Sequence, residues 1–95
     1  MLSQIPTRLK NVPSDKIDQE ILRAAIIAEL DAVNLYEQMA AIATQQAIRD
    51  ILFDVAKEEK THIGEFQALL LQRDLEQHVE MKKGAQEVGE ILGHE

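Results

Sequence analysis

Hydrophobic residues recur every three or four positions along two long stretches of the sequence, which is the spacing of one helix face. The first series comprises Leu22, Ala25, Glu29, Ala32, Tyr36, Met39 and Ala43. The second comprises Ile48, Leu52, Val55, Glu59, His62, Phe66 and Leu69. The pattern predicts two helices with buried stripes. One runs from a cap at Ser14 or Asp15 to about Thr44, and the other runs from about Gln45, capped by Thr44, to Arg73.

The two ends of the chain have different patterns. Residues 1–13 contain Pro6 and Pro13 and no regular period, so an extended arm is expected there. Asp74 and Gln77 resemble a capping box, which predicts a short helix with a tail over residues 74–95. Three glycines in this segment indicate that the helix is less stable than the other two.

Almost no loop separates the two long helices, so residues 14–73 are expected to form an antiparallel helical hairpin. The predicted fold is therefore all-α, a hairpin followed by a short C-terminal helix. A chain of 95 residues is near the lower limit for a self-sufficient core, and its aromatic content is only 3%. We expect dimerisation to complete a four-helix bundle.

Composition removes several classes of function. The net charge of −7 argues against nucleic-acid binding, which depends on Lys and Arg. The absence of Cys excludes disulfides, thiolate zinc sites and iron–sulfur clusters. No apolar run approaches the roughly 18 residues of a membrane span, and the N-terminus lacks the apolar centre of a secretory signal. A soluble, intracellular protein is expected.

Three polar residues, Glu29, Glu59 and His62, interrupt the apolar stripes. Glu29 precedes Thr44 by the same number of positions by which Glu59 follows it. Both therefore lie about 22 Å from the turn, at the same level of the hairpin. His62 is one turn further along, on the same face as Glu59. The spacing predicts that these three side chains converge.

Two carboxylates and an imidazole in an apolar seam would be stabilised by a divalent cation, and this donor set suits iron, manganese or zinc. Two hairpins related by a two-fold axis would supply four Glu and two His, as in di-metal carboxylate bundles. This predicts a homodimer with metals in its interface. A purely structural polar network is the alternative. On the opposite helix face, Ile27, Leu35 and Ile42 indicate a second interface and a larger assembly. His78 and His94 are expected to be solvated.

The stretches AIIAELDAVNLYEQ (25–38) and DVAKEEKTHIGEFQALL (54–70) resemble the encapsulated ferritins, half-length ferritin-like proteins that work inside encapsulin compartments. The resemblance implies a ferroxidase centre between two antiparallel subunits, with Glu29, Glu59 and His62 as iron ligands. It also implies a ring-like decamer of five dimers, in the cytoplasm within an encapsulin shell that stores the oxidised iron. Manganese, zinc or calcium could replace iron in a crystal.

The resemblance places a tyrosine of the family near the centre at Tyr36. From its position alone, Tyr36 is either a core residue with a bonded hydroxyl or a neighbour of the metals. The family's outer metal-uptake positions correspond to Ala28, Asp31 and Leu35, of which only Asp31 could bind a cation. Residues 93–95 do not resemble the shell-targeting peptide of members that are carried as separate cargo.

Three functions therefore follow as hypotheses. The first is a ferroxidase that oxidises Fe(II) with O₂ for iron storage. The second is a rubrerythrin-like peroxide reductase. Such an enzyme needs a nearby electron donor, and a chain without Cys carries no rubredoxin-type centre. The third is a non-enzymatic helical assembly protein, in which the polar stripe residues specify the register between helices.

Overall fold

A computed structural model describes residues 11–93, and over this range the chain contains three helices and no strand. They are α1 (Ile17–Ile42), α2 (Gln46–Arg73) and α3 (Leu75–Leu92). The predicted all-α class is confirmed. Most of the arm expected for residues 1–13, and His94, lie outside the described residues. None of the described helices is long and apolar enough to span a membrane.

The helix starts differ from the predicted caps. Helix α1 begins only at Ile17, because residues before it form a turn in which the Lys16 amide donates to the Pro13 carbonyl at 2.9 Å. Its N-cap, Lys16, makes no side-chain cap, so the caps predicted at Ser14 or Asp15 are wrong. The cap predicted at Thr44 is wrong as well, since α2 starts after Gln45, which also lacks a side-chain cap.

Arg49 closes the tip of the hairpin. Its guanidinium donates through Nε to the Ala40 carbonyl at 3.2 Å and through Nη2 to the Ala43 carbonyl at 2.6 Å. Carbonyls at the end of a helix have no partner further along it, so a cation that binds them stabilises that end. A side chain of α2 thus holds the end of α1 across the short link 43–45.

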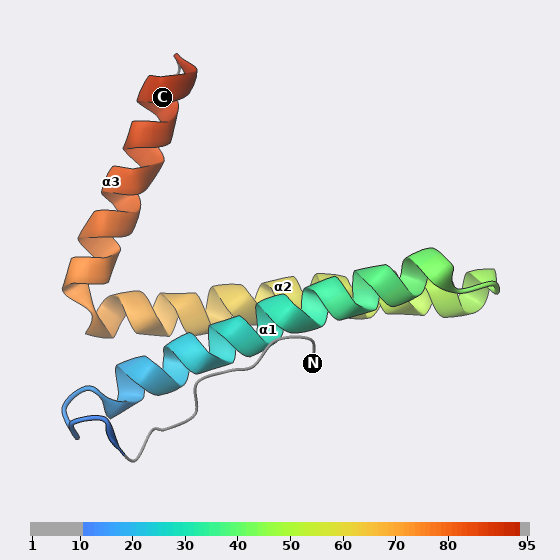
Figure 1. Ribbon diagram of the computed structural model, residues 1–95, viewed down its shortest axis with the longest axis horizontal. Helices are drawn as coiled ribbons and strands as arrows, with labels where there is room; N and C mark the ends of the chain where they lie inside the picture. The colour runs from blue at the N-terminus through green and yellow to red at the C-terminus, as the bar shows by residue number, and fades with distance from the viewer. Residues whose placement is uncertain (1–10, 94–95) are drawn as a thin grey trace.

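Helices α1 and α2 run antiparallel along their length (Figure 1). The buried hydrophobic residues are Val33, Ala40, Ala56 and Leu70. Each lies four residues after one member of the predicted stripes and one residue after another, so the buried residues lie about 70° further around the helix than the middle of the stripe. All stripe residues are half-buried or exposed. The prediction that the stripes form a buried seam is therefore wrong for the single chain, because a pair of helices contacts along one line and the stripes flank it.

Helix α3 projects steeply away from the hairpin, and it contacts the end of α2 only near their shared corner (Figure 1). The Asp74 carboxylate accepts a hydrogen bond from the Gln77 amide at 3.0 Å, which confirms the predicted cap. The helix continues through Gly84 and ends at Gly93, whose φ of 78° is the left-handed conformation that glycine tolerates. A C-terminal helix was expected, and it spans 18 residues.

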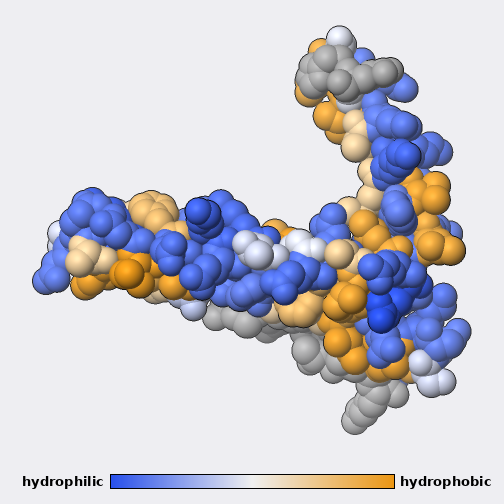
Figure 2. All heavy atoms as spheres, turned by 180° about the vertical axis from the view of Figure 1, so that it is seen from behind, coloured by the Kyte–Doolittle hydropathy of each residue, from blue (hydrophilic) through white to orange (hydrophobic). Residues whose placement is uncertain are grey.

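Much of the apolar surface remains open. Figure 2 shows hydrophobic surface at the tip of the hairpin and around the corner where α3 begins. Among residues 11–93, fourteen large hydrophobic residues are exposed, against four buried hydrophobic ones, so this part of the chain leaves much of its apolar surface open. The exposed residues are Ile21, Ile27, Leu30, Ile42, Ile48, Ile51, Phe53, Leu69, Leu75, Val79, Met81, Val88, Ile91 and Leu92. Of the predicted second-face residues, Ile27 and Ile42 are among them, whereas Leu35 is half-buried.

Candidate metal centre

The candidate centre lies at the midpoint of the hairpin. Glu29 is close to the middle of α1, Ile17–Ile42, and Glu59 is close to the middle of α2, Gln46–Arg73. The two carboxylates are therefore level across the helix pair, and His62 occupies the next turn of α2. Long, uninterrupted helices place all three side chains.

The structure brings these three predicted residues together. One ligand atom from each of Glu29, Glu59 and His62 lies within 4.8 Å of the other two. The His62 Nδ1 is 3.2 Å from Glu29 Oε2 across the helix pair and 3.7 Å from Glu59 Oε2 in its own helix. Among the described residues, no other three His, Asp or Glu side chains cluster in this way. We call these three residues the triad.

The triad is partly open to solvent. The side chains of Glu29 and Glu59 are 22% and 17% exposed, and that of His62 is 46% exposed. The carboxylates are thus mostly enclosed by the hairpin, whereas the imidazole lies at its surface. A cation or a second protein surface could reach the group from this side. Two oxygen donors and one nitrogen donor suit iron, manganese or zinc better than calcium.

The crowding of the triad changes its protonation. A hydrogen bond shared with the Glu29 carboxyl group raises the pKa of Glu59 above its ordinary value of 4.5, and burial and the charge of Glu29 act in the same direction. A hydrogen bond to Glu29 also raises the pKa of His62 above 6.5, helped by the nearby carboxylates and opposed by burial. Bound protons therefore reduce the charge repulsion within the triad, and a divalent cation could replace them.

Tyr36 lies on the same face of α1, two turns beyond Glu29. Its Cα is about 10 Å further along the helix axis. The residue is half-buried, and its hydroxyl makes no hydrogen bond within the described part of the chain. Tyr36 therefore does not orient the triad through a hydrogen bond.

Asp31, the remaining acidic residue of the expected uptake site, is buried at 7% exposure. It follows Glu29 by two residues, so it points about 200° away around α1. It is not part of the triad. His78, which was expected to be solvated, is exposed.

Glu65 is a neighbour that the sequence pattern did not select. Its helix position points away from Glu59, but it follows His62 by three residues, the spacing of adjacent side chains on a helix. Its negative charge contributes to the raised pKa of His62. A hollow of about 140 Å³ beside the triad is lined by His62, Glu65, Phe66 and Leu69. The sequence signal that identifies Glu65 is its spacing of three residues from His62. Its position relative to Glu59 gives no such signal.

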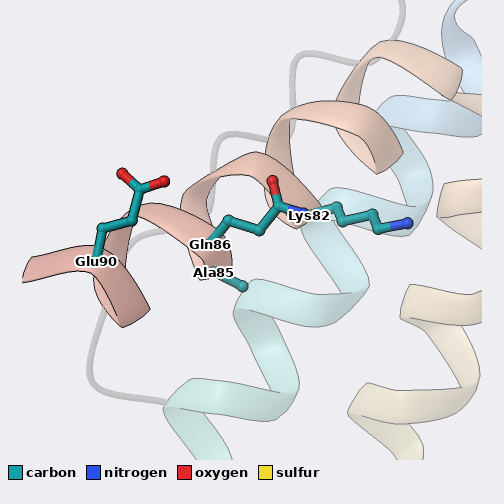
Figure 3. A pocket seen from close by; sticks show the side chains of 4 residues that line it. All are labelled: Lys82, Ala85, Gln86 and Glu90. Carbon is teal, nitrogen blue, oxygen red and sulfur yellow. The ribbon is translucent and has the colours of Figure 1, made fainter. Parts of the chain in front are cut away.

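A larger hollow of about 540 Å³ lies along α3 and does not resemble a catalytic site. Its lining includes Lys82, Ala85, Gln86 and Glu90, all from one helix. Figure 3 shows the charged ends of Lys82 and Glu90 pointing in different directions. Their backbones are about 12 Å apart along the helix, so no set of donors converges there.

Comparisons with known proteins agree with this geometry. The family model described as Rubrerythrin matches residues 20–92. A ferritin-like–encapsulin shell fusion protein of Pyrococcus furiosus is 56% identical over 97 aligned residues, which cover the whole chain. The chain spans only 28% of the length of that relative. The crystal structure of an encapsulated ferritin domain from Pyrococcus furiosus is 52% identical, with a TM-score of 0.83 over 100% of this chain and 99% of that one.

Proposed function

Because this chain belongs to the rubrerythrin family, and within it to the encapsulated ferritins, we propose that it is a ferroxidase that converts Fe(II) to Fe(III) with O₂. The observation that carries the proposal is the triad, whose donors converge within 4.8 Å on a half-exposed helix face. Two Fe(II) substrate ions each give one electron, and O₂ takes up these two electrons and two protons to become hydrogen peroxide.

The site would be shared by two copies of the chain. One hairpin offers three ligands, which are too few for two iron ions, whereas a two-fold pair offers four carboxylates and two imidazoles. The half-exposed stripe around the triad supports this pairing, because it is the apolar face that a second hairpin would cover. In the pair, Glu59 would bridge the two substrate ions, and Glu29 and His62 would complete the ligands of each. Exposed Ile27 and Ile42 on the opposite face support a further ring assembly, proposed as a decamer.

The proposed partner is an encapsulin shell, and the proposed location is the cytoplasmic compartment that such a shell encloses. The support is the Pyrococcus furiosus relative, in which a ferritin-like part is fused to an encapsulin shell. In this arrangement the chain would oxidise iron and the shell would retain the product. Co-purification of this chain with an encapsulin shell from the same cell tests the association.

Stopped-flow absorbance after mixing Fe(II) with aerobic protein tests the ferroxidase proposal. Removal of a metal ligand should slow oxidation at least as much as loss of an outer-shell partner, so we expect a decrease of about 100-fold in Glu59→Ala and His62→Ala. Glu58→Ala is the matched control, because Glu58 is an exposed carboxylate next to Glu59 outside the triad. Oxidation at the parent rate in both triad variants would refute the assignment.

A peroxide reductase is the second candidate, and the match to the rubrerythrin family favours it. It would use the same triad but reduce hydrogen peroxide with electrons from a separate donor protein. Peroxide consumption that depends on a reduced donor, and that exceeds Fe(II) oxidation under the same conditions, would support this function over ferroxidation.

A further inference from the structure

A set of polar contacts closes the open end of the hairpin, opposite the tip, where the start of α1 approaches the corner between α2 and α3 (Figure 1). Arg23 forms an ion pair with Asp74 and donates through Nε to Gln77 Oε1 at 3.1 Å. Gln19 Nε2 donates to the Arg73 carbonyl at 2.9 Å. We call these contacts the corner clamp. It joins all three helices.

The corner clamp is partly shielded from solvent. The Asp74 side chain is only 13% exposed, and that of Arg23 is 39% exposed. Asp74 also caps α3, so one carboxylate both starts that helix and binds α1. Arg23 is the only basic residue within α1, Ile17–Ile42. No neighbouring Lys or Arg of that helix could therefore replace it.

The open end of α1 contributes no fully buried side chain of its own, although Leu70 of α2 is fully buried at this end of the hairpin. The buried residues of α1 are Asp31, Val33 and Ala40, so none of its residues before Glu29 is buried. The half of α1 that precedes the triad therefore has no fully buried anchor of its own. At the other end, Arg49 and the short link fix α1 at the tip.

The position of Glu29 depends on how α1 is held at both ends. Measured along the helix from Ala43 at the tip, Glu29 is about 21 Å away and Arg23 is about 30 Å away. If α1 pivots at the tip so that Arg23 moves by about 3 Å, a rigid helix carries Glu29 by about 2 Å. That displacement is about two-thirds of the 3.2 Å contact between Glu29 and His62, so it is enough to break this contact.

We infer that Arg23, through the corner clamp, is a positioning residue that holds Glu29 in register with Glu59 and His62. Arg23 touches neither the triad nor a substrate, and acts through the rigid helix that connects it to Glu29. The inference deepens the proposed function and rests on the triad being a metal site.

The experiment titrates Co(II), as a probe for a divalent cation, into the parent and three variants and follows the visible absorption of the bound ion. We expect Arg23→Ala to weaken Co(II) binding about tenfold and to change the absorption spectrum, as loss of an outer-shell partner does. Arg23→Lys, which retains the charge opposite Asp74, should restore part of the loss. Arg73→Ala is the matched control, because its side chain donates only within its own helix, to the Leu69 carbonyl at 3.1 Å.

A distance measurement separates positioning from unfolding. The chain has no Cys, so spin labels at Asp18→Cys and Gln72→Cys, both exposed, report the opening of this end after dilution with unlabelled chain. We expect a broader distance distribution in Arg23→Ala with helix content retained by circular dichroism. A broader distribution with parent-like Co(II) binding would overturn the positioning role and leave the proposed function intact. A parent chain that binds no Co(II) would overturn the metal site itself, and this role with it.

Discussion

Two lines of side chains run along the hairpin about 70° apart, and they differ in what covers them. The contact line is closed, with Ala40 and Leu70 at 0% exposure and Ala56 at 2%. The two predicted stripes, which carry the triad and are together called the metal stripe, have no buried member. Small residues on the contact line let the two helices approach closely. The difference indicates that one line stabilises the single chain, whereas the other is left for a cation and a second surface.

The largest expected effect separates the two lines at adjacent leucines. Leu70 belongs to the contact line and is fully buried, whereas Leu69 belongs to the metal stripe and is 42% exposed. Leu70→Ala should decrease the free energy of unfolding by about 2–5 kcal/mol, the cost of a core cavity. In the dilute, metal-free chain, Leu69→Ala should decrease the free energy of unfolding by well under half as much. Urea unfolding followed by circular dichroism measures both.

The same pair of variants should behave in the opposite way in self-association. Leu69→Ala removes apolar area from the stripe that a second copy would cover, so it should weaken dimerisation more than Leu70→Ala does, provided that the chain stays folded. Sedimentation at several concentrations gives this ranking. Equal effects of the two variants on both unfolding and association would mean that the two lines are not distinct.

The next effect concerns the cation. If the triad binds a metal in the folded chain only, free Co(II) at about 100 times its Kd should stabilise the fold by about 2.7 kcal/mol, and a chelator should reverse this. For a chain of this size the shift in Tm is about 10–20 °C. Glu59→Ala should lose the shift and Glu58→Ala should keep it. An unchanged Tm in the parent would favour the non-enzymatic assembly protein.

The smallest effect is the pH dependence of the metal-free chain. Because the folded-state pKa values of Glu59 and His62 are raised, the folded chain binds protons more tightly than the unfolded chain. This stabilisation is complete below the ordinary values of 4.5 and 6.5 and is lost as the pH rises through the raised values. Tm in the presence of chelator should therefore fall as the pH rises above 4.5, and fall further as it rises above 6.5. The double variant Glu59→Gln, His62→Gln should flatten this slope.

Much of the fold follows from local rules that the sequence displays. Uninterrupted helical periodicity on either side of Thr44 predicts two long helices, and the lack of a loop predicts their antiparallel packing. The N-caps were harder to predict, because α1 and α2 start after Lys16 and Gln45, and neither residue makes a side-chain cap. The C-terminal end of α1 is instead bound by Arg49 of α2, a tertiary contact that the local sequence does not display. The periodicity also does not say which line of a helix contacts which neighbour, so the buried seam was placed about 70° from the contact line.

The triad was predictable for a geometric reason. Its two carboxylates lie at equal distances from a short turn, so counting residues is enough to bring Glu29 level with Glu59. Glu65 and Arg23 were not selected, because each acts through another residue and neither lies on the stripe. The spacing of Glu65 from His62 is visible in the sequence, whereas Asp74 and Gln77 become neighbours of Arg23 only when the helices are placed in space. Metal binding by the triad stays a prediction, which the Co(II) titration tests for a divalent cation and the stopped-flow oxidation tests for iron.

The central placement of the triad has a consequence for symmetry. A two-fold axis that passes through the middle of a rod, perpendicular to its length, exchanges the positions of its two ends. Two hairpins that share such a site can therefore overlap along their full length, with no overhang at either end. Had Glu29 and Glu59 been near the tip, the same axis would leave most of each hairpin unpaired. Placing the ligands at the midpoint thus makes the largest possible contact area compatible with a shared site.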